Sequence, residues 1–409
     1  MRGPGPRDYF ALAATTASNG MGLLLPLYLA HSGHPVGLVG LLTGLAAIAA
    51  LLSRIPLPFL YRPQRSRQIL LVTSAAGMVS AAAMPVMPDL ISFTLILMVN
   101  RIASGIATAV YLARYLDLIG EGVDRRRVMG YYGGTQAAGY AFSSLFTGLI
   151  ADYAGFTAAF LFSAATSGLA AVLMLGLGNP ATSQHVGRTV APSRPPGRLR
   201  GWVAGVDDPG LWGVLNINTW NNFFHIINVT FFPVLATAIG MPPAQIGIIR
   251  ALYSSINAVS RPIAGLVMGR LALRQIAYMG ITLQAMLLFA GPFIRDLLVF
   301  IPWTLAYGFG RAIVVVATSA GLAEDVDDTR VSRGAATATY STSSDISNVA
   351  APLLGGLIAS LVGVVAMFPL TAVGFFACFV TGDFLVGRWR ARRVLDQADI
   401  AAPASTSSG

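Results

Sequence analysis

The chain has 409 residues, of which 55% are hydrophobic and only 11% are charged, and its mean hydropathy is +0.67. An ordinary soluble domain has about 25% charged residues, so this composition excludes a soluble globular protein and indicates an integral membrane protein. The net charge of +10 comes from arginine, because the sequence contains no lysine. The lack of lysine excludes a lysine-dependent phosphate-binding loop, a Schiff-base enzyme and a pyridoxal site.

Few residues remain that could support metal or enzyme chemistry. Cys378 is the only cysteine, so it has no partner for an intramolecular disulfide. The four histidines have no metal-ligand spacing with carboxylates or thiols, and the apolar runs hold no nucleophile beside a base. We therefore expect no enzyme activity, no metal and no cofactor. We also expect no nucleic-acid partner, because the arginines are dispersed among loops.

Apolar stretches of about 20 residues recur along nearly the whole chain, which is typical of a helical bundle and not of a β-barrel. The first stretch is too long for the core of a signal peptide and contains Asn19 and Pro26, so it is predicted to be a span. The lengths of the apolar stretches, and the polar, Gly and Pro residues that interrupt them, predict twelve spans. These lie near residues 9–30, 36–60, 68–87, 90–117, 127–153, 156–177, 211–238, 244–269, 274–294, 297–322, 334–361 and 364–386.

One long interruption, rich in Pro, Gly, Ser and Arg, divides these spans six and six and has the composition of a linker. We predict an N-terminal six-helix bundle over 1–178, a cytoplasmic linker over 179–210, a C-terminal six-helix bundle over 211–387 and a disordered cytoplasmic tail over 388–409. The predicted fold class is an all-α membrane protein with twelve transmembrane helices.

The positions of the arginines predict the orientation of the spans. With both termini in the cytoplasm, the arginines of the loops and tails fall on the cytoplasmic side, with Arg295 as the one exception. Abundant arginine and alanine without lysine indicate a GC-rich bacterial genome. We therefore expect the protein to lie in the lipid bilayer of a bacterial cytoplasmic membrane. We also expect a monomer.

The two predicted halves share short sequence matches at nearly constant offsets. Ser53-Arg54 recurs as Ser260-Arg261, 207 positions later, at the cytoplasmic end of the second span of each half. Gly148-Leu-Ile-Ala151 with Gly155 recurs as Gly356-Leu-Ile-Ala359 with Gly363, 208 positions later. Two matches on equivalent spans predict a duplicated six-helix unit.

Residues 9–387 resemble the major facilitator superfamily of secondary transporters, which implies two pseudo-symmetric bundles. Arg101-Ile-Ala-Ser-Gly105 is similar to the family's arginine motif in span 4, which the family ties to substrate binding or proton coupling. Residues 139–148 resemble its antiporter motif in span 5, but Ser143 and Ser144 replace the usual Gly-Pro pair. Antiport therefore has partial support from the motifs.

The loops after spans 2 and 8 resemble the family's conformational latch. Ser260-Arg-Pro-Ile-Ala-Gly265 followed by Arg270 matches the motif, except that Gly269 stands where Asp is usual. The first copy, from Arg54 to Arg62, departs further, with Pro58 in place of Gly and Arg62 in place of Asp. The resemblance implies that the latch residues are Arg54, Arg62, Arg261 and Arg270, without the usual acid.

Arg101 lies midway in an apolar run long enough to cross a bilayer. A charge at this depth costs about 2.5–3.5 kcal/mol on insertion scales, so it is expected to face the bundle interior or a water-filled path. Arg101, Ser104, Gly105 and Thr108 have the spacing of one helix face. This face is predicted to line a cavity, and pairing with a neighbouring helix is the alternative.

Polar side chains also recur at helical spacing in other spans. Besides Arg101, the predicted translocation path contains Asn19, Gln136, Asn218, Asn221, Asn222, His225, Arg250, Asn257, Tyr307, Arg311 and Asn348. Asp345 is the only acid well inside a span, and it comes to a mid-membrane depth similar to that of Arg311, so the two could pair. Hydrogen bonding between helices is the alternative for the asparagines. Spans 3, 6, 9 and 12 have no charge in their central parts and are predicted to face lipid.

Three intramembrane arginines, Arg101, Arg250 and Arg311, outnumber the single acid Asp345. This excess favours a small organic solute that is anionic or amphipathic, carried by alternating access. Asp345 is the expected proton carrier if transport is proton-coupled, and His225 is the reserve candidate. One alternative is efflux of hydrophobic or cationic drug-like compounds by proton antiport, and another is a receptor or scaffold that does not transport.

Overall fold

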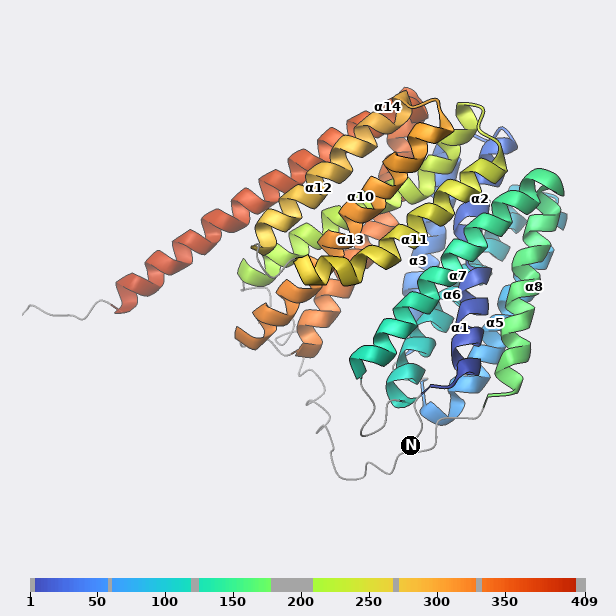
Figure 1. Cartoon of the computed structure of the whole chain (residues 1–409), viewed down its shortest axis with the longest axis horizontal. Coiled ribbons are helices and arrows are strands. Elements are labelled where there is room, and N and C mark those ends of the chain that lie inside the picture. Colours follow the sequence, from blue (N-terminus) through green and yellow to red (C-terminus); the bar gives the residue numbers. More distant parts are fainter. Residues whose placement is uncertain are drawn as a thin grey trace, which may run out of the picture.

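The computed structural model describes residues 4–57, 61–118, 125–177, 209–267, 272–328 and 333–401, and every regular element within these ranges is a helix. The first half contains α1 (Pro6–Ser18), α2 (Met21–His31), α3 (Val36–Arg54), α5 (Ser66–Ala83), α6 (Leu90–Leu118), α7 (Arg125–Tyr153) and α8 (Gly155–Leu175). The second half contains α10 (Pro209–Ala238), α11 (Pro243–Val267), α12 (Leu273–Ala290), α13 (Leu297–Asp328) and α14 (Arg333–Ala401). The two halves lie side by side (Figure 1).

Two irregularities reconcile these helices with the twelve predicted spans. The first span is broken at Asn19 and Gly20, between α1 and α2. In α14, Gly363 has φ 82° and ψ 158°, so this element consists of two helices joined at a sharp turn. The prediction of an all-α protein with two bundles of six spans is confirmed.

Positive-φ glycines show the duplication in the backbone. Gly155 has φ 84° and its repeat partner Gly363 has φ 82°, so the turn between the fifth and sixth spans is the same in both halves. Gly33 and Gly240, 207 positions apart, also have positive φ, of 74° and 84°. Glycine adopts this region without the steric cost that a Cβ brings, so the repeated turns depend on repeated glycines.

Eight helices of the described part are long and apolar enough to cross a membrane, the last of which, Tyr340–Arg392, spans the turn at Gly363. The helices α7, α10 and α11 are not among them, and each carries polar side chains toward the protein interior. The helices predicted to face lipid, α5, α8, α12 and the second part of α14, present exposed apolar side chains such as Val72, Val172, Met286 and Val373. Exposed apolar side chains of this size suit a lipid-facing position.

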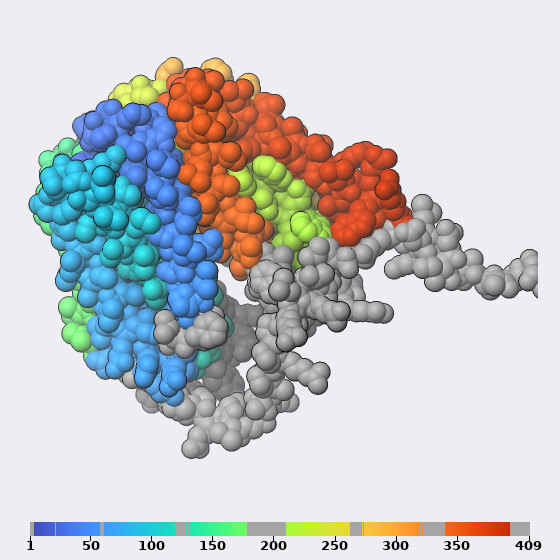
Figure 2. All heavy atoms as spheres, turned by 180° about the vertical axis from the view of Figure 1, so that it is seen from behind, coloured from blue at the N-terminus to red at the C-terminus, as the bar shows by residue number. Residues whose placement is uncertain are grey.

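The halves are in close contact at one end of the bundle. We call the end that carries the N-terminus and the loop arginines the arginine-rich end, and the other the opposite end. A Cβ built on Gly40 of α3 would lie 2.6 Å from Gly356 Cα of α14, and one built on Gly148 of α7 would lie 2.6 Å from Gly247 Cα of α11. Small residues permit such close helix packing in membranes. From behind, α3 (blue) lies along the first part of α14 (orange) at this seam (Figure 2).

The C-terminal tail differs from its prediction. The second helix of α14 continues to Ala401, so residues 388–401 are helical where the sequence was expected to be disordered. Residues 388–397 are mainly Arg, Ala, Leu and other residues with good helix propensity. The predicted linker lies almost wholly outside the described residues.

Candidate functional site: a cavity between the halves

A cavity of about 510 Å³ lies between the two halves. Its walls come from the break between α1 and α2 and from α3, α6 and α7 in the first half, and from α10, α11, α13 and α14 in the second. Arg54 and Arg261, near the arginine-rich ends of α3 and α11, are partly exposed, while the glycine contacts close the opposite end. The cavity therefore extends from the middle of the bundle toward the arginine-rich end.

The wall from the first half combines a helix break with a buried arginine. Asn19 caps the end of α1, and its Oδ1 accepts a hydrogen bond of 2.7 Å from Ser104 Oγ of α6. Arg101, one turn before Ser104, lines the cavity and makes no hydrogen bond or ion pair with any described residue. On α7, Gln136 donates to Tyr132 Oη at 2.9 Å.

The wall from the second half contains a second buried arginine, and two of its nitrogens lack hydrogen-bond partners among the described residues. Arg250 of α11 is only 8% exposed, and its Nε and Nη1 have no hydrogen-bond partner among the described residues. Its guanidinium carbon lies 5.5 Å from the centre of the Tyr253 ring. The Tyr253 hydroxyl is 2.6 Å from His225 Nδ1 of α10, so His225 and Tyr253 form one polar unit beside Arg250.

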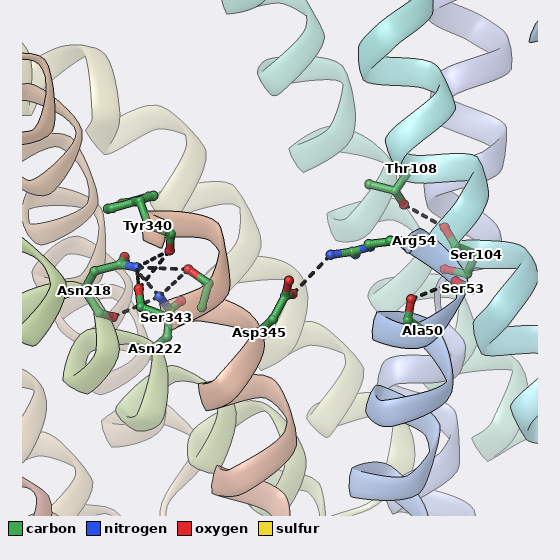
Figure 3. A network of polar contacts seen from close by, with 11 residues as sticks. Ala50, Ser53, Arg54, Ser104, Thr108, Asn218, Asn222, Tyr340, Ser343 and Asp345 are labelled. Atoms are coloured by element: carbon green, nitrogen blue, oxygen red, sulfur yellow. Dashed lines mark hydrogen bonds and ion pairs between the residues drawn. The ribbon is translucent and has the colours of Figure 1, made fainter. Parts of the chain in front are cut away.

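The pairing suggested for Asp345 and Arg311 is wrong. Asp345 forms an ion pair with Arg54 of the other half, with 3.1 Å between Oδ1 and Nη1 (Figure 3). Arg311 instead donates to the Asn221 carbonyl at 3.4 Å and to Asn222 Oδ1 at 3.3 Å. Counting residues along each helix gives depth but not the direction of the side chain around the helix, and here Asp345 points across the seam.

The charge on the cavity wall is strongly positive. Arg54, Arg101, Arg250, Arg261 and Arg311 line it, while Asp345 is the one acid among the described lining residues. That acid is already paired with Arg54, whose side chain is 40% exposed. The more deeply placed arginines therefore have no carboxylate counter-charge within the described wall.

Most of the predicted path residues line this cavity. They are Asn19, Arg101, Gln136, His225, Arg250, Asn257, Arg311 and Asn348, and the candidate proton carrier Asp345 lines it too. Two residues of the predicted latch, Arg54 and Arg261, line it as well. Arg62 is exposed beside the short turn Pro63–Arg65, and Arg270 lies outside the described residues.

Four predicted path residues do not line the cavity and instead form hydrogen bonds between helices. They are Asn218, Asn221, Asn222 and Tyr307. Asn218 Nδ2 donates to Ser343 Oγ at 2.7 Å, which ties α10 to α14, and Asn222 Nδ2 donates to Ser344 Oγ at 3.1 Å (Figure 3). Asn221 Oδ1 accepts from Gln284 of α12. Tyr307 donates to the Phe224 carbonyl at 2.8 Å.

Two tyrosines of the cavity wall, Tyr140 and Tyr253, were not predicted. Tyr253 lies three residues after Arg250, and Tyr140 lies four residues after Gln136, so each falls on a helix face that already carried a predicted residue. Helical spacing was the signal that could have identified them.

The comparisons with known proteins agree with this architecture. The family model for the Major Facilitator Superfamily matches residues 9–327 and 211–403. No curated protein matches the chain by sequence. Two crystal structures of a bacterial homologue of the human lysosomal transporter Spinster are similar to this chain at 13% identity. The inward-facing, occupied one has a TM-score of 0.72 over 93% of this chain and 95% of that one. The inward-facing, unoccupied one has a TM-score of 0.74 over 95% and 98%.

Proposed function

The chain belongs to the Major Facilitator Superfamily, and from this membership we propose that it is a secondary active transporter that carries a small organic anion, or an amphipathic molecule with an anionic group, by alternating access. The observation that carries this proposal is Arg250, which is buried in the cavity wall with two nitrogens that lack partners among the described residues. An uncompensated buried charge costs several kcal/mol, and a carboxylate or phosphate supplies both the counter-charge and the missing acceptors.

The arrangement of the halves supports alternating access. The glycine contacts of α3 with α14 and of α7 with α11 close one end, and the cavity reaches toward the other. With the orientation proposed from the arginines, in a bacterial cytoplasmic membrane with both termini inside, this is an inward-facing state. Rocking of the halves about a mid-depth site would expose Arg101 and Arg250 to the other side.

A hydrophobic cation fits this wall less well. A cation would need a carboxylate, and the one acid among the described lining residues, Asp345, is engaged by Arg54. The aromatic side chains Tyr140 and Tyr253 could contact a cation, but Arg250 already lies against Tyr253. Drug efflux therefore remains the second candidate.

The test compares anions with cations on the same variant. The purified protein should be stabilised against heat by some aromatic or aliphatic carboxylates and phosphates, and not by tetraphenylphosphonium. In proteoliposomes, Arg101→Ala should lose most uptake of an anion found in this way. An Arg101→Ala protein that keeps anion uptake, or that loses uptake of a hydrophobic cation instead, would contradict the proposal.

Proton coupling, if present, would act on the ion pair between the halves. Asp345 is 19% exposed and is held by Arg54 across the seam, so a proton on Asp345 would break a link between α14 and α3. If Asp345 carries the proton, uptake by Asp345→Asn should no longer respond to an imposed pH gradient, while Asp152→Asn, at an exposed position, should respond normally. A full response in Asp345→Asn would remove Asp345 from this role.

A further inference from the structure

A second, smaller cavity lies within the first half, beside the break between α1 and α2. Its volume is about 20 Å³, enough for one water-sized particle. The residues that line it and carry a side-chain oxygen are Thr15, Ser18, Asn19, Thr73, Ser74, Asn100, Ser104 and Ser167. No charged residue is among its described lining residues, so its chemistry is that of neutral oxygen atoms.

The hydrogen bonds already made around this small cavity leave mainly oxygen lone pairs for an occupant. Thr15, Ser18 and Thr73 each donate their hydroxyl proton to a backbone carbonyl of their own helix. Ser104 donates to Asn19, and the Asn100 amide donates to Ser80 and to the Gly77 carbonyl. A water molecule can donate only two hydrogen bonds to such lone pairs, whereas a hard cation binds to several of them at once.

A buried hydroxyl of this cavity is also available to an occupant. Ser74 is only 6% exposed, and its hydroxyl has no hydrogen-bond partner within the described residues although it lines this cavity. The small cavity also adjoins Ser18 and Asn19, at the C-terminal end of α1. The carbonyls of Thr15, Thr16 and Ala17 at this helix end already accept hydrogen bonds from Ser18 Oγ, Asn19 N and Gly20 N, so an ion here would be held mainly by the side-chain oxygens.

We propose that the oxygen-lined cavity between α1, α5, α6 and α8 binds a dehydrated monovalent cation of the size of sodium. The cavity is too small for a hydrated ion, and its neutral oxygens suit an alkali cation better than a transition metal, which prefers thiolate or imidazole ligands. Asn19 and Ser104 line the small cavity and also the main cavity. The hydrogen bond between them therefore separates the two cavities.

This position couples the cation to the main cavity. Arg101 follows Asn100 in sequence and precedes Ser104 by one turn, so its positive charge disfavours a cation in the neighbouring site. An anion bound at Arg101 would neutralise that charge. If the protein carries an anion as proposed above, the cation and the anion therefore bind cooperatively. Each raises the affinity of the protein for the other by the same factor.

The test uses the full-length protein and sodium itself, without any organic anion. We expect saturable binding of ²²Na⁺ and a higher unfolding temperature in NaCl than in KCl or choline chloride at equal ionic strength. Ser74→Ala and Thr73→Val should each weaken sodium binding by about tenfold or more. Arg101→Gln should strengthen it, because the repelling charge is removed.

A matched control is Ser163→Ala. The Ser163 hydroxyl is also buried without a partner among the described residues, but Ser163 does not line the small cavity. Equal unfolding temperatures in all salts with no saturable ²²Na⁺ binding would mean that the cavity holds only water, and this would overturn the site. So would equal sodium affinities in Ser74→Ala and Ser163→Ala. Neither result would contradict the proposed anion transport. Conversely, sodium binding can still be measured if the protein does not transport anions, so the two proposals fail independently.

Discussion

Replacing Gly40 with valine is expected to abolish most transport while the protein still folds. A Cβ at this position would lie 2.6 Å from Gly356 Cα and closer still to the Pro352 carbonyl oxygen. These are backbone atoms, so α3 and α14 would have to separate. Overpacking of this kind costs about 1–3 kcal/mol, and such a difference shifts an equilibrium between two states by about 5–150-fold. The state closed at the opposite end would become rare.

The shift can be measured by the accessibility of a cysteine. Thr43 lines the cavity and follows Gly40 by one turn. The background protein carries Cys378→Ser and Thr43→Cys, so the new cysteine at position 43 is the one to be labelled. A membrane-impermeant maleimide added on the side of the membrane that the opposite end faces should label it slowly, and Gly40→Val should speed this labelling. Gly374→Val is the matched control, because Gly374 is exposed on α14 and a Cβ added there would have no heavy atom within 4 Å. Equal transport and equal labelling in the two valine variants would rule out this glycine contact as the closing element.

The glycine contacts also show how far the repeat could be used for prediction. Gly247 lies 207 positions after Gly40, and Gly356 lies 208 after Gly148, which are the offsets found from the sequence alone. The two contacts are therefore equivalent under the duplication. The repeat identified Gly148 and Gly356 as equivalent positions. It did not reveal that Gly356 touches Gly40, because a repeat relates positions and contains no information about contacts between the halves.

The site residues that could be predicted from the sequence were the charged side chains inside apolar spans, because only a cavity or a polar partner can accommodate them. Arg101 and Arg250 are too costly to place toward lipid, and both line the cavity. The asparagines of α10 are neutral and small enough to be satisfied between helices, so spacing alone could not tell which neighbour they meet. His225 faces the cavity, while Asn221, four residues earlier, bonds to Gln284. A helix surrounded by other helices can carry polar groups on several faces.

Replacing Arg250 with glutamine is expected to move binding and stability in opposite directions. Removing one partner of a buried, hydrogen-bonded charge pair costs about 2–5 kcal/mol, so affinity for an anionic substrate should fall by about thirtyfold or more. The substrate-free protein should unfold at a higher temperature, because a buried guanidinium without described acceptors at Nε and Nη1 is removed. Arg250→Lys should restore the charge but not the forked hydrogen bonding, and so should recover only part of the affinity.

These opposite effects separate a binding role from a structural one. If Arg250 served only to hold α11 in place, Arg250→Gln would lower the unfolding temperature and the binding together. Arg388→Gln is the control, because Arg388 is exposed and lies against the Phe384 ring, far along α14 from the cavity lining. Thermal unfolding with and without an anionic ligand, measured on the wild type and the three variants, gives both quantities. Because a substrate supplies the acceptors that Arg250 lacks among the described residues, the gain in unfolding temperature on adding ligand should be largest in the wild type.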